Sequence, residues 1–397
     1  NETILSGDIG TAGDSTDNCY HVIFNSEINN TALLDGFTIT AGQADNYSVD
    51  NVTHGGGGGV YNYKSSLVIT NCHFNNNYAY FGGAIINQEG LPTFSDCVFT
   101  DNRSLYQGGA IFSYKTALRL NKSSFSKNKS DDGGAICNFV VSSAVILNSD
   151  FTQNEAREGA GIHNYQSTPD IVSCVFDNNK TDVENEGRGG GIYNYESSPR
   201  CNSCTFRKNS AKYGGAIYNG MNSSSNIDNC LFVKNSAEYG AGVHNFISSP
   251  QIFNCTFFGN YINNYFGGAA IENNNDSNPS IMNSIFQGNY RTSDDSLANI
   301  YGGNFEDITY CSFYRDQKIY PGEGNIYDYA AFTDTSGVDG ICGTADDDFS
   351  LKDNSPCIGA GSSIGASGFD IRGKERGTPP DMGAYENELN SPKIKII

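Results

Sequence analysis

The sequence of 397 residues lacks tryptophan and contains only 10 proline and 3 methionine residues. It also lacks an apolar run of about 18 residues, the length that a membrane-spanning helix needs. Positive charge is scarce, because 24 lysine and arginine residues stand against 44 acidic ones, for a net charge of −20. Nucleic acid and anionic membrane surfaces attract positively charged proteins. We therefore expect no nucleic-acid partner and no membrane insertion.

Glycine is abundant, with 46 residues, and many of them open one repeated phrase. The phrase reads GGAIIN at 82–87, GGAICN at 133–138, GAGIHN at 159–164, GGGIYN at 189–194, GGAIYN at 214–219 and GAGVHN at 240–245. A second phrase, such as NCHF at 71–74, ends in a marker phenylalanine. The markers are Phe74, Phe99, Phe125, Phe151, Phe176, Phe206, Phe232, Phe257, Phe286 and Phe313. They recur every 25 to 30 residues, which indicates a solenoid with one coil per repeat.

The coils read as strands rather than helices, since no stretch of ten or more residues shows a period of about 3.6. Short alternating segments are instead separated by glycine, asparagine and serine, which favour tight turns. Two or three short strands in a coil of about 25 residues fit a parallel β-helix, in which coils stack at about 4.8 Å. We predict an all-β, right-handed parallel β-helix of about ten or more coils, with an irregular C-terminal cap.

Two asparagine columns support stacked coils. One column stands three residues after the marker phenylalanine, at Asn77, Asn102, Asn128, Asn154, Asn179, Asn209, Asn235, Asn260 and Asn289. The other follows the isoleucine of the glycine phrase by two residues, at Asn62, Asn87, Asn138, Asn164, Asn194, Asn219 and Asn245. Asparagine tolerates a left-handed turn, and stacked amides form hydrogen-bonded ladders. The glycine pair is expected to supply positive φ and close packing.

The alternating GGAI and nCxF phrases resemble secreted right-handed β-helix proteins, including the repeats of chlamydial polymorphic outer-membrane proteins and the pectate-lyase-like superfamily. The stretch GVDGICGTADDDFSLKDNSPCIGAGS at 337–362, followed by DMGAYE at 381–386, resembles the choice-of-anchor Q region of bacterial surface β-helices. The resemblance implies a bacterial extracellular or cell-surface protein. We expect N-terminal coils and an insertion loop at 1–54, regular repeats at 55–316, a cap at 317–389 and a tail strand at 390–397.

Cysteine stands two residues before the marker in most coils, and serine replaces it in the others. This column is Cys72, Cys97, Cys174, Cys204, Cys230, Cys255 and Cys311. Exchange with serine favours a small inward residue, so we expect a reduced cysteine ladder rather than disulfides. Cys201 and Cys204 form a CxxC, but no second pair accompanies them, which argues against zinc. Cys342 and Cys357, in the irregular C-terminal region, are the candidate disulfide.

Carboxylates cluster at Asp339, Asp346, Asp347 and Asp348 in a glycine-containing loop. Oxygen ligands of this kind suit calcium, while a solvated acidic loop is the alternative interpretation. Calcium is therefore the candidate cofactor of this loop. Candidate glycosylation sites of the N-x-S/T type lie outside the ladders at Asn46, Asn51, Asn222 and Asn275.

A mixed column precedes the glycine pair, and it places Asp132, Glu158 and Arg188 on consecutive coils. A carboxylate pair beside a cation is the chemistry of a polysaccharide lyase or glycoside hydrolase. The alternative interpretation is an exposed turn whose opposite charges attract one another. Because the chain itself is acidic, a polyanionic substrate is disfavoured, and catalysis at this column is the secondary hypothesis.

The outward residues of the glycine-phrase strand are rich in rings. By the two-residue period, we predict an outward aromatic contact face. Its members are Tyr61, Tyr63, Phe112, Tyr114, Phe139, His163, Tyr165, Tyr193, Tyr195, Tyr218, His244 and Phe246. Such a face would stack on glycans, pack against another protomer or lie under a loop.

The primary functional hypothesis is a non-catalytic extracellular rod, adhesive or filament-forming. The first coil carries no recognisable cap, and SPKIKII at 391–397 alternates like a strand. An open β-helix end recruits another chain, so we expect head-to-tail association of the protein with itself. The alternative is a polysaccharide-degrading enzyme that uses Asp132, Glu158 and Arg188.

Overall fold

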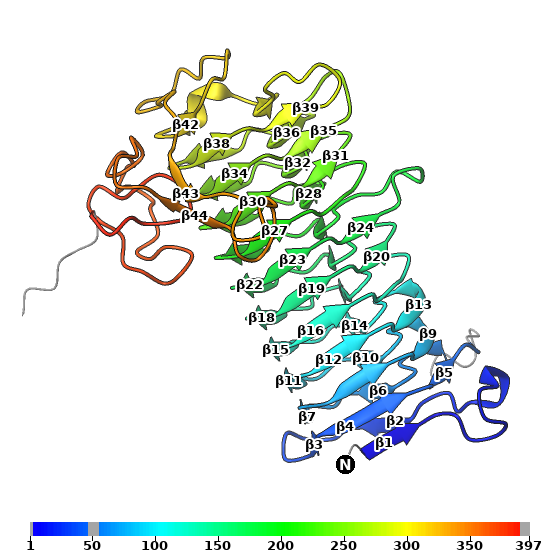
Figure 1. The fold of residues 1–397 in the computed structure, drawn as a ribbon. Coiled ribbons are helices and arrows are strands. Elements are labelled where there is room, and N and C mark those ends of the chain that lie inside the picture. The colour runs from blue at the N-terminus through cyan, green and yellow to red at the C-terminus, as the bar shows by residue number, and fades with distance from the viewer. Residues whose placement is uncertain (1–2, 47–54, 390–397) are drawn as a thin grey trace, which may run out of the picture. The chain divides into compact units, whose positions relative to one another are not determined.

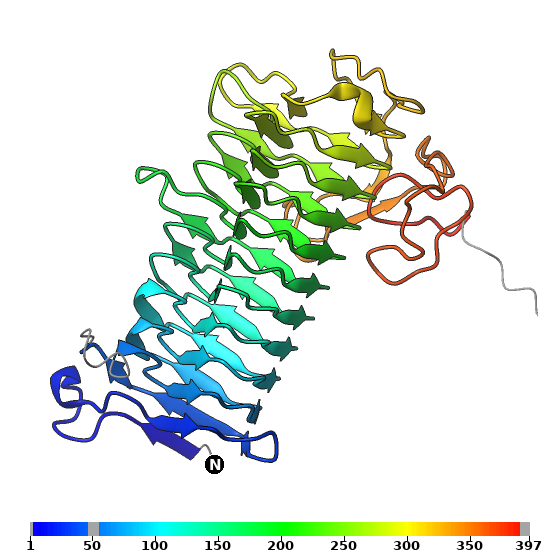
Figure 2. The ribbon, with the colours of Figure 1, turned by 180° about the vertical axis from the view of Figure 1, so that it is seen from behind.

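The computed structural model describes residues 3–46 and 55–389, and these fall into two compact units, unit 1 at residues 1–199 and unit 2 at residues 200–397. Both units are built from short parallel strands, one set per coil. Figures 1 and 2 show the strands of each unit stacked one on the next from two opposite sides. Within each unit, equivalent strands of successive coils form a sheet.

The marker phenylalanines of unit 1 lie on one sheet, here called the phenylalanine sheet. Its strands are β1 (Thr3–Ser6), β4 (Phe37–Thr40), β8 (His73–Asn75), β12 (Val98–Thr100), β16 (Ser124–Ser126), β19 (Asp150–Thr152) and β23 (Val175–Asp177). The glycine phrases form the isoleucine sheet. Its strands are β2 (Ile23–Ser26), β6 (Val60–Tyr63), β10 (Ile85–Gln88), β14 (Ile111–Tyr114), β17 (Ile136–Phe139), β21 (Ile162–Tyr165) and β25 (Ile192–Tyr195).

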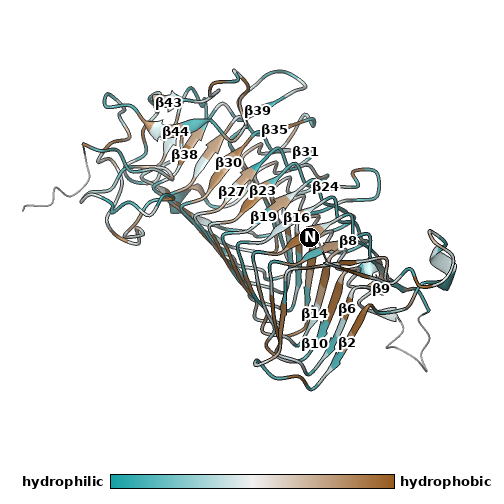
Figure 3. Ribbon diagram, turned by 60° about the horizontal axis from the view of Figure 1, so that its bottom comes forward, coloured by the Kyte–Doolittle hydropathy of each residue, from teal (hydrophilic) through white to brown (hydrophobic). Residues whose placement is uncertain are grey.

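A third sheet closes each coil of unit 1, and short arm strands precede the glycine pairs. The third sheet comprises β3 (Leu33–Asp35), β7 (Val68–Thr70), β11 (Thr93–Ser95), β15 (Arg119–Asn121), β18 (Val145–Leu147) and β22 (Asp170–Val172). The arm strands are β5 (Gln43–Ala44), β9 (Tyr78–Phe81), β13 (Arg103–Gln107), β20 (Glu155–Ala156) and β24 (Lys180–Thr181). A single turn of 3₁₀ helix, η1 (Ser15–Asp17), lies near the N-terminus. Figure 3 shows hydrophobic colour along strands such as β6 and β14 and hydrophilic colour in most loops.

Unit 2 repeats this arrangement. Its phenylalanine sheet comprises β27 (Thr205–Arg207), β30 (Leu231–Val233), β34 (Thr256–Phe258), β38 (Ile285–Gln287) and β42 (Ser312–Phe313), and its isoleucine sheet comprises β28 (Ile217–Gly220), β32 (Val243–Phe246), β36 (Ile271–Asn274) and β40 (Ile300–Tyr301). Its third sheet comprises β26 (Arg200–Asn202), β29 (Asn226–Asp228), β33 (Gln251–Phe253), β37 (Ser280–Met282) and β41 (Ile308–Thr309). Its arm strands are β31 (Ser236–Ala237), β35 (Tyr261–Ile262) and β39 (Tyr290–Arg291), and η3 (Phe305–Asp307) follows them.

The inward columns hold the coils together. In unit 1 the rings of Phe99 and Phe125 stack with centroids 4.6 Å apart, and both side chains are fully buried. The Asn102 Nδ2 donates to Asn128 Oδ1 at 3.0 Å, and Asn128 Nδ2 donates to Asn154 Oδ1 at 3.0 Å. Unit 2 repeats the ladder, with Asn235 Nδ2 donating to Asn260 Oδ1 at 2.9 Å. The predicted asparagine ladder is confirmed.

The expectation that the ladder asparagine itself takes up the left-handed conformation of the turn is wrong. The residue with positive φ at the turn is the one before it, such as Lys127 at 56° or Gln153 at 55°. The ladder asparagine is selected for its amide, which satisfies buried backbone groups as well as its neighbour; Asn128 Nδ2, for example, also donates to the Phe99 carbonyl at 3.0 Å.

The cysteine column is buried and reduced, as expected. Cys97 and Cys174 lie in the core of unit 1, and Cys230 and Cys255 lie in the core of unit 2, all as free thiols. The Cys97 Sγ approaches the Ser95 carbonyl at 3.3 Å. The column therefore fills space at the turn and carries weak hydrogen bonds.

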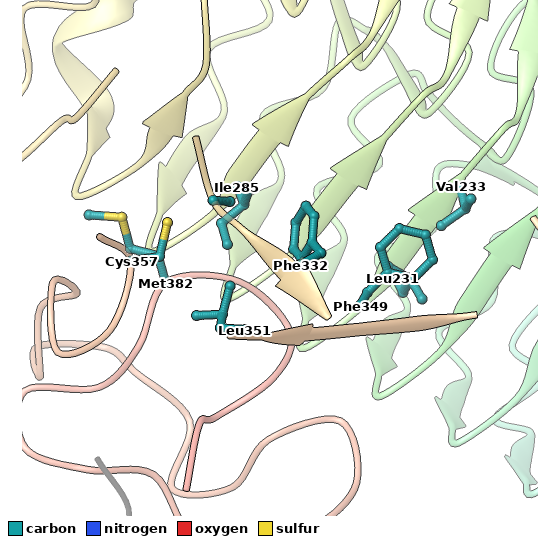
Figure 4. Packing of buried hydrophobic residues seen from close by; sticks show 9 residues of the cluster. Leu231, Val233, Ile285, Phe332, Phe349, Leu351, Cys357 and Met382 are labelled. Atoms are coloured by element: carbon teal, nitrogen blue, oxygen red, sulfur yellow. The ribbon is translucent and has the colours of Figure 1, made fainter. Parts of the chain in front are cut away.

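Unit 2 contains a second core outside its coils. Strands β43 (Phe332–Asp334) and β44 (Asp348–Leu351) pair antiparallel, and their apolar side chains pack on the outer face of the phenylalanine sheet. Figure 4 shows this cluster. Its buried members are Leu231, Val233, Ile285, Ala330, Phe332, Phe349, Leu351, Cys357 and Met382. The segment that was expected to form an irregular cap thus covers the side of unit 2's sheet.

Candidate functional site

The first of the two predicted ring columns is buried rather than exposed. Its members in unit 1 are Tyr61, Phe112, His163 and Tyr193, and those in unit 2 are Tyr218 and His244, and each side chain is at most 7% exposed. For these residues the prediction of an outward contact face is wrong. They do point away from the coil interior, but residues just before the glycine pairs pack against members of this column, as Phe81 does against Phe112 and Tyr213 against His244.

The glycine pair causes this burial. Its first glycine has positive φ, for example 66° at Gly108, and a Cβ there would lie 2.3 Å from the Ile111 carbonyl oxygen. The turn brings the residue before the pair against the outward column, so that Phe81 and Phe112 have ring centroids 5.6 Å apart. Each unit therefore has a corner between its arm strands and its isoleucine sheet. The two-residue alternation along a strand predicts which side chains point inward and which point outward. It does not predict whether another segment covers the outward ones.

The second ring column is half-buried: Tyr63, Tyr114, Phe139, Tyr165 and Tyr195 in unit 1, and Phe246 in unit 2. Four of these rings lie on adjacent strands and form what we call the ring strip: Tyr114, Phe139, Tyr165 and Tyr195. Phe139 and Tyr165 stack at 4.8 Å, and Tyr165 and Tyr195 stack at 5.4 Å. In unit 2 the neighbours of Phe246 in register are Gly220 and Asn274, so the strip is a feature of unit 1.

The structure brings Asp132, Glu158 and Arg188 together in the corner of unit 1. Arg188 Nη1 lies 2.8 Å from Glu158 Oε1. Arg157, which sequence reasoning missed, places Nη1 3.3 Å from the same oxygen and Nη2 3.0 Å from Asp132 Oδ1. The two carboxylate side chains are only 16% and 11% exposed, whereas Arg157 is 42% exposed. The column is therefore an ion-pair network with its acids inside and its bases at the rim.

His163 lies beneath this network. Its Nδ1 is 3.9 Å from Asp132 Oδ2, beyond hydrogen-bonding distance, and its side chain is 4% exposed. Neither ring nitrogen has a hydrogen-bond partner among the residues that the structure describes. Tyr193 contacts the ring edge-on with centroids 4.8 Å apart, and Cys137 is its partner in register on β17.

Burial in the corner shifts the pKa values of these groups. Burial lowers the pKa of His163 to about 4, so the ring is neutral at pH 7. Burial raises the pKa of Asp132 to about 6, and the Arg157 guanidinium opposes this rise. Burial and the Asp132 carboxylate raise the pKa of the Cys137 thiol. Sequence reasoning assigned His163 to the ring column and gave Cys137 no role, because both sit among aromatic residues in the alignment of repeats.

Among the residues that the structure describes, the corner contains one group of potential metal ligands. Asp132, Glu158 and His163 each offer one ligand atom, and these atoms lie within 4.8 Å of one another. A shallow depression of about 310 Å³, lined by Phe81, Tyr106, Gln107, Asp131 and Asp132, opens beside them. Of the three residues, Asp132 lines this depression.

The predicted calcium loop is organised by its own backbone. Asp346 Oδ2 accepts hydrogen bonds from the N–H groups of Val338 and Asp339, at 2.7 and 3.2 Å. Asp347 Oδ2 accepts from Gly343 N at 2.6 Å, and Asp348 Oδ1 accepts from Ser350 N at 2.9 Å. Such bonds close tight turns. Calcium at Asp339, Asp346, Asp347 and Asp348 stays a prediction.

The predicted disulfide between Cys342 and Cys357 is wrong, since both are free thiols. Cys357 is fully buried in the outer core of unit 2, where burial raises its pKa to about 11. Cys342 lies in the acidic loop, where Lys234 and Lys208 oppose the rise in its pKa that burial causes. Cys342 is also partly buried and packs against the same outer core that contains Cys357.

Three of the four candidate glycosylation sites are exposed, namely Asn46, Asn222 and Asn275. Attachment of a glycan there stays a prediction. Asn51 and the tail strand at 390–397 lie outside the described residues. The head-to-tail association and the proposed domain limits at 54, 316 and 389 also stay predictions.

Comparisons with known proteins agree with this fold. Residues 8–134 match a family described as a right-handed beta helix region, and residues 173–195 and 203–220 match the Chlamydia polymorphic membrane protein repeat. The chain is a right-handed parallel β-helix repeat protein related to these repeats, so the predicted fold class is confirmed.

A solved structure, that of pectate lyase Pel9A, is similar with a TM-score of 0.49 and 14% sequence identity, over 90% of this chain and 87% of that chain. No curated protein matches the chain. Within the described residues, no helix has the length and apolar character needed to cross a membrane.

Proposed function

We propose that this protein is a non-catalytic adhesive β-helix of a bacterial cell surface that binds a protein partner through the ring strip. The observation that carries the proposal is the row of aligned, half-buried rings on four adjacent strands of unit 1. Rings held in register by a stacked backbone are preorganised, so little conformational entropy is lost when a partner binds.

The geometry of the strip favours a protein surface over a sugar ring. Phe139, Tyr165 and Tyr195 cover one another's faces, with interplanar angles of 15° and 7°. A sugar stacks on an open aromatic face, whereas this strip offers ring edges and tyrosine hydroxyls. Tyrosine combines an apolar body with a polar tip and is enriched at protein interfaces.

The relation to polymorphic membrane protein repeats supports a surface setting for this chain. A surface protein that binds by a repeated face needs a stiff scaffold, and stacked coils with buried ladders provide one. The exposed candidate sites Asn46, Asn222 and Asn275 are compatible with glycosylation of the same protein.

Catalysis at Asp132, Glu158 and Arg188 receives less support from the geometry. Glu158 Oε1 is already bound by two guanidinium groups, and Asp132 Oδ1 by one. A polysaccharide would have to displace these cations from largely buried carboxylates, which is costly. The group therefore fits a structural role better than an acid–base role.

Binding of the labelled full chain to arrays of extracellular-matrix proteins and glycans tests the proposal. The triple variant Tyr114→Ser, Tyr165→Ser, Tyr195→Ser should lose protein binding by at least about tenfold. The matched control is Tyr213→Ser with Tyr239→Ser, since these rings also stack, at 5.3 Å, but lie in unit 2. Equal binding by the triple variant and the wild type would refute the role of the strip.

A parallel assay separates the enzymatic alternative. The full chain and its Arg188→Ala variant are incubated with acidic and neutral polysaccharides, and product release is measured. We expect none from either protein. If the wild type releases product and Arg188→Ala does not, the protein is an enzyme and the adhesive function is refuted. Sedimentation of the same samples would separately show whether the protein associates with itself.

A further inference from the structure

We propose that Asp132, Glu158 and His163 form a binding site for a divalent transition-metal cation in the corner of unit 1. The three side chains come from two successive coils: Asp132 precedes β17, whereas Glu158 precedes β21 and His163 lies on it. Their ligand atoms are within 4.8 Å of one another. A cation with bonds of about 2.1 Å holds its ligands roughly 3 to 4 Å apart. Small side-chain rotations would therefore bring the three ligand atoms close enough to bind one cation.

The buried histidine distinguishes this site from an ordinary acidic cluster. A buried imidazole normally donates with one nitrogen and accepts with the other, yet both nitrogens of His163 lack partners among the described residues. Its Nδ1 faces Asp132 Oδ2 at 3.9 Å, a distance too long for a hydrogen bond and suited to two ligands of one ion. The ring therefore points at the place where a cation would satisfy it.

The donor set selects the class of metal. One imidazole nitrogen with two carboxylates suits zinc, manganese, iron or cobalt, whereas calcium prefers oxygen ligands throughout. Cys137 is the neighbour of His163 in register and is fully buried. Its thiol is not one of the three grouped ligands, so the metal class follows from the imidazole and the two carboxylates alone.

The two arginines set the strength of binding. Arg157 and Arg188 occupy Asp132 Oδ1 and Glu158 Oε1, while Asp132 Oδ2 is the oxygen nearest to His163. A cation would therefore share the carboxylates with guanidinium groups at the rim. Both arginine side chains are at least one-third exposed, so their guanidinium groups lie on the solvent side of the carboxylates. We expect binding that is moderate in affinity and stronger when a guanidinium is removed.

The bound ion would join two coils. Asp132 lies on one coil and Glu158 and His163 on the next, so the cation would link the turn before β17 to the turn before β21 and to β21 itself. Because a ligand that binds only the folded state stabilises it by mass action, unit 1 would unfold at a higher temperature with metal than without it.

The experiment uses the full chain after treatment with EDTA, titrated with zinc, cobalt, manganese or calcium chloride. Calorimetry and thermal unfolding should report one saturable site for zinc and cobalt, and a rise in Tm. Bound cobalt should show visible absorption. Binding of calcium alone would overturn the assigned metal class.

His163→Phe is the decisive variant, because the same column carries phenylalanine at Phe112 and the fold accepts a ring there. His244→Phe is the matched control, a buried histidine at the equivalent position in unit 2. The first should lose the site and the second should retain it. Binding that survives His163→Phe, or no binding by the wild type, would refute the proposal. Asp132→Asn provides an independent loss of the site if His163→Phe does not fold.

Discussion

Units 1 and 2 are built from the same repeat and differ in what covers the outside of their sheets. In unit 1 the residue before the marker phenylalanine faces solvent, as Val98 does with 38% of its side chain exposed. In unit 2 the equivalent residues Leu231 and Ile285 are 5% and 1% exposed, because β43 and β44 pack on them. Inward positions are thus common to both units, whereas outward positions are specialised.

The corners of the two units differ as well. In unit 1 the carboxylates of Asp132 and Glu158 meet Arg157 and Arg188. In unit 2 the buried carboxylate is Glu272, which accepts a hydrogen bond from Gly268 N at 2.6 Å. Arg291 opposes the rise in its pKa only as the smallest of the contributions. The corner of unit 1 therefore pairs its buried acids with arginine, whereas burial in the corner of unit 2 raises the pKa of Glu272 to about 7 and favours its protonated form.

The largest expected effect comes from placing a charge on the outer face of each phenylalanine sheet. Leu231→Asp puts a carboxylate into the outer core of unit 2 and should lower the free energy of unfolding by about 3 to 5 kcal/mol. Val98→Asp is the matched control in unit 1 and should change it by less than about 0.5 kcal/mol. Chemical denaturation measures both, and equal losses would show that the two faces are covered alike.

Glu272 makes the stability of unit 2 depend on pH. Burial raises its pKa from 4.5 to about 7, so between these values the folded protein keeps a proton that the unfolded chain has lost. The free energy of unfolding therefore falls as pH rises through this window, by about 3 kcal/mol in total. Arg291 is the charged group that opposes this rise, and His244 is the partner of Glu272 in register.

Glu272→Gln tests this dependence. The amide oxygen can still accept from Gly268 N, but the variant has no proton to exchange. Unfolding measured from pH 4 to pH 8 should show a smaller decline in the variant than in the wild type. A decline of the same size in both proteins would assign the pH dependence to other groups.

The inward ladder offers a comparison in which the units should behave alike. Asn128→Ala in unit 1 and Asn260→Ala in unit 2 each remove an amide that bonds to both neighbouring coils. Each should cost about 2 kcal/mol or more, since buried donors and acceptors lose their partners. Urea unfolding checks this, and a loss confined to one unit would contradict the common role of the ladder.

The smallest expected effect comes from the rim of the unit 1 corner. Arg188→Ala removes one of the two cations on Glu158 and should cost about 1 kcal/mol or less, because Arg188 is partly exposed and Arg157 remains. Arg157→Ala should cost more, since Arg157 binds both Asp132 and Glu158. Unfolding at low and high salt would measure the difference, and the opposite order would show that Arg188 is the main counterion.

Much of the fold could be predicted because its inward residues repeat with a fixed period. Phe99, Asn128 and Cys97 occupy columns that recur in nearly every coil, and stacking makes each column a contact between neighbours. The corner could not be predicted in the same way. Arg157 and Cys137 occur once each among unlike residues, so no column indicated that they approach Asp132 and His163.

The sequence by itself determined the coil, its period, its inward columns and the location of its glycine turns, because each of these depends on residues close together in the chain or one repeat apart. The tertiary structure decided which outward residues are covered. The turn at the glycine pair brings Phe81 over Phe112 and Asp132 near His163, and the segment around Phe332 and Phe349 returns to cover Leu231. These contacts depend on the angle at a turn and on the path of a distant segment, and neither is encoded in a two-residue alternation.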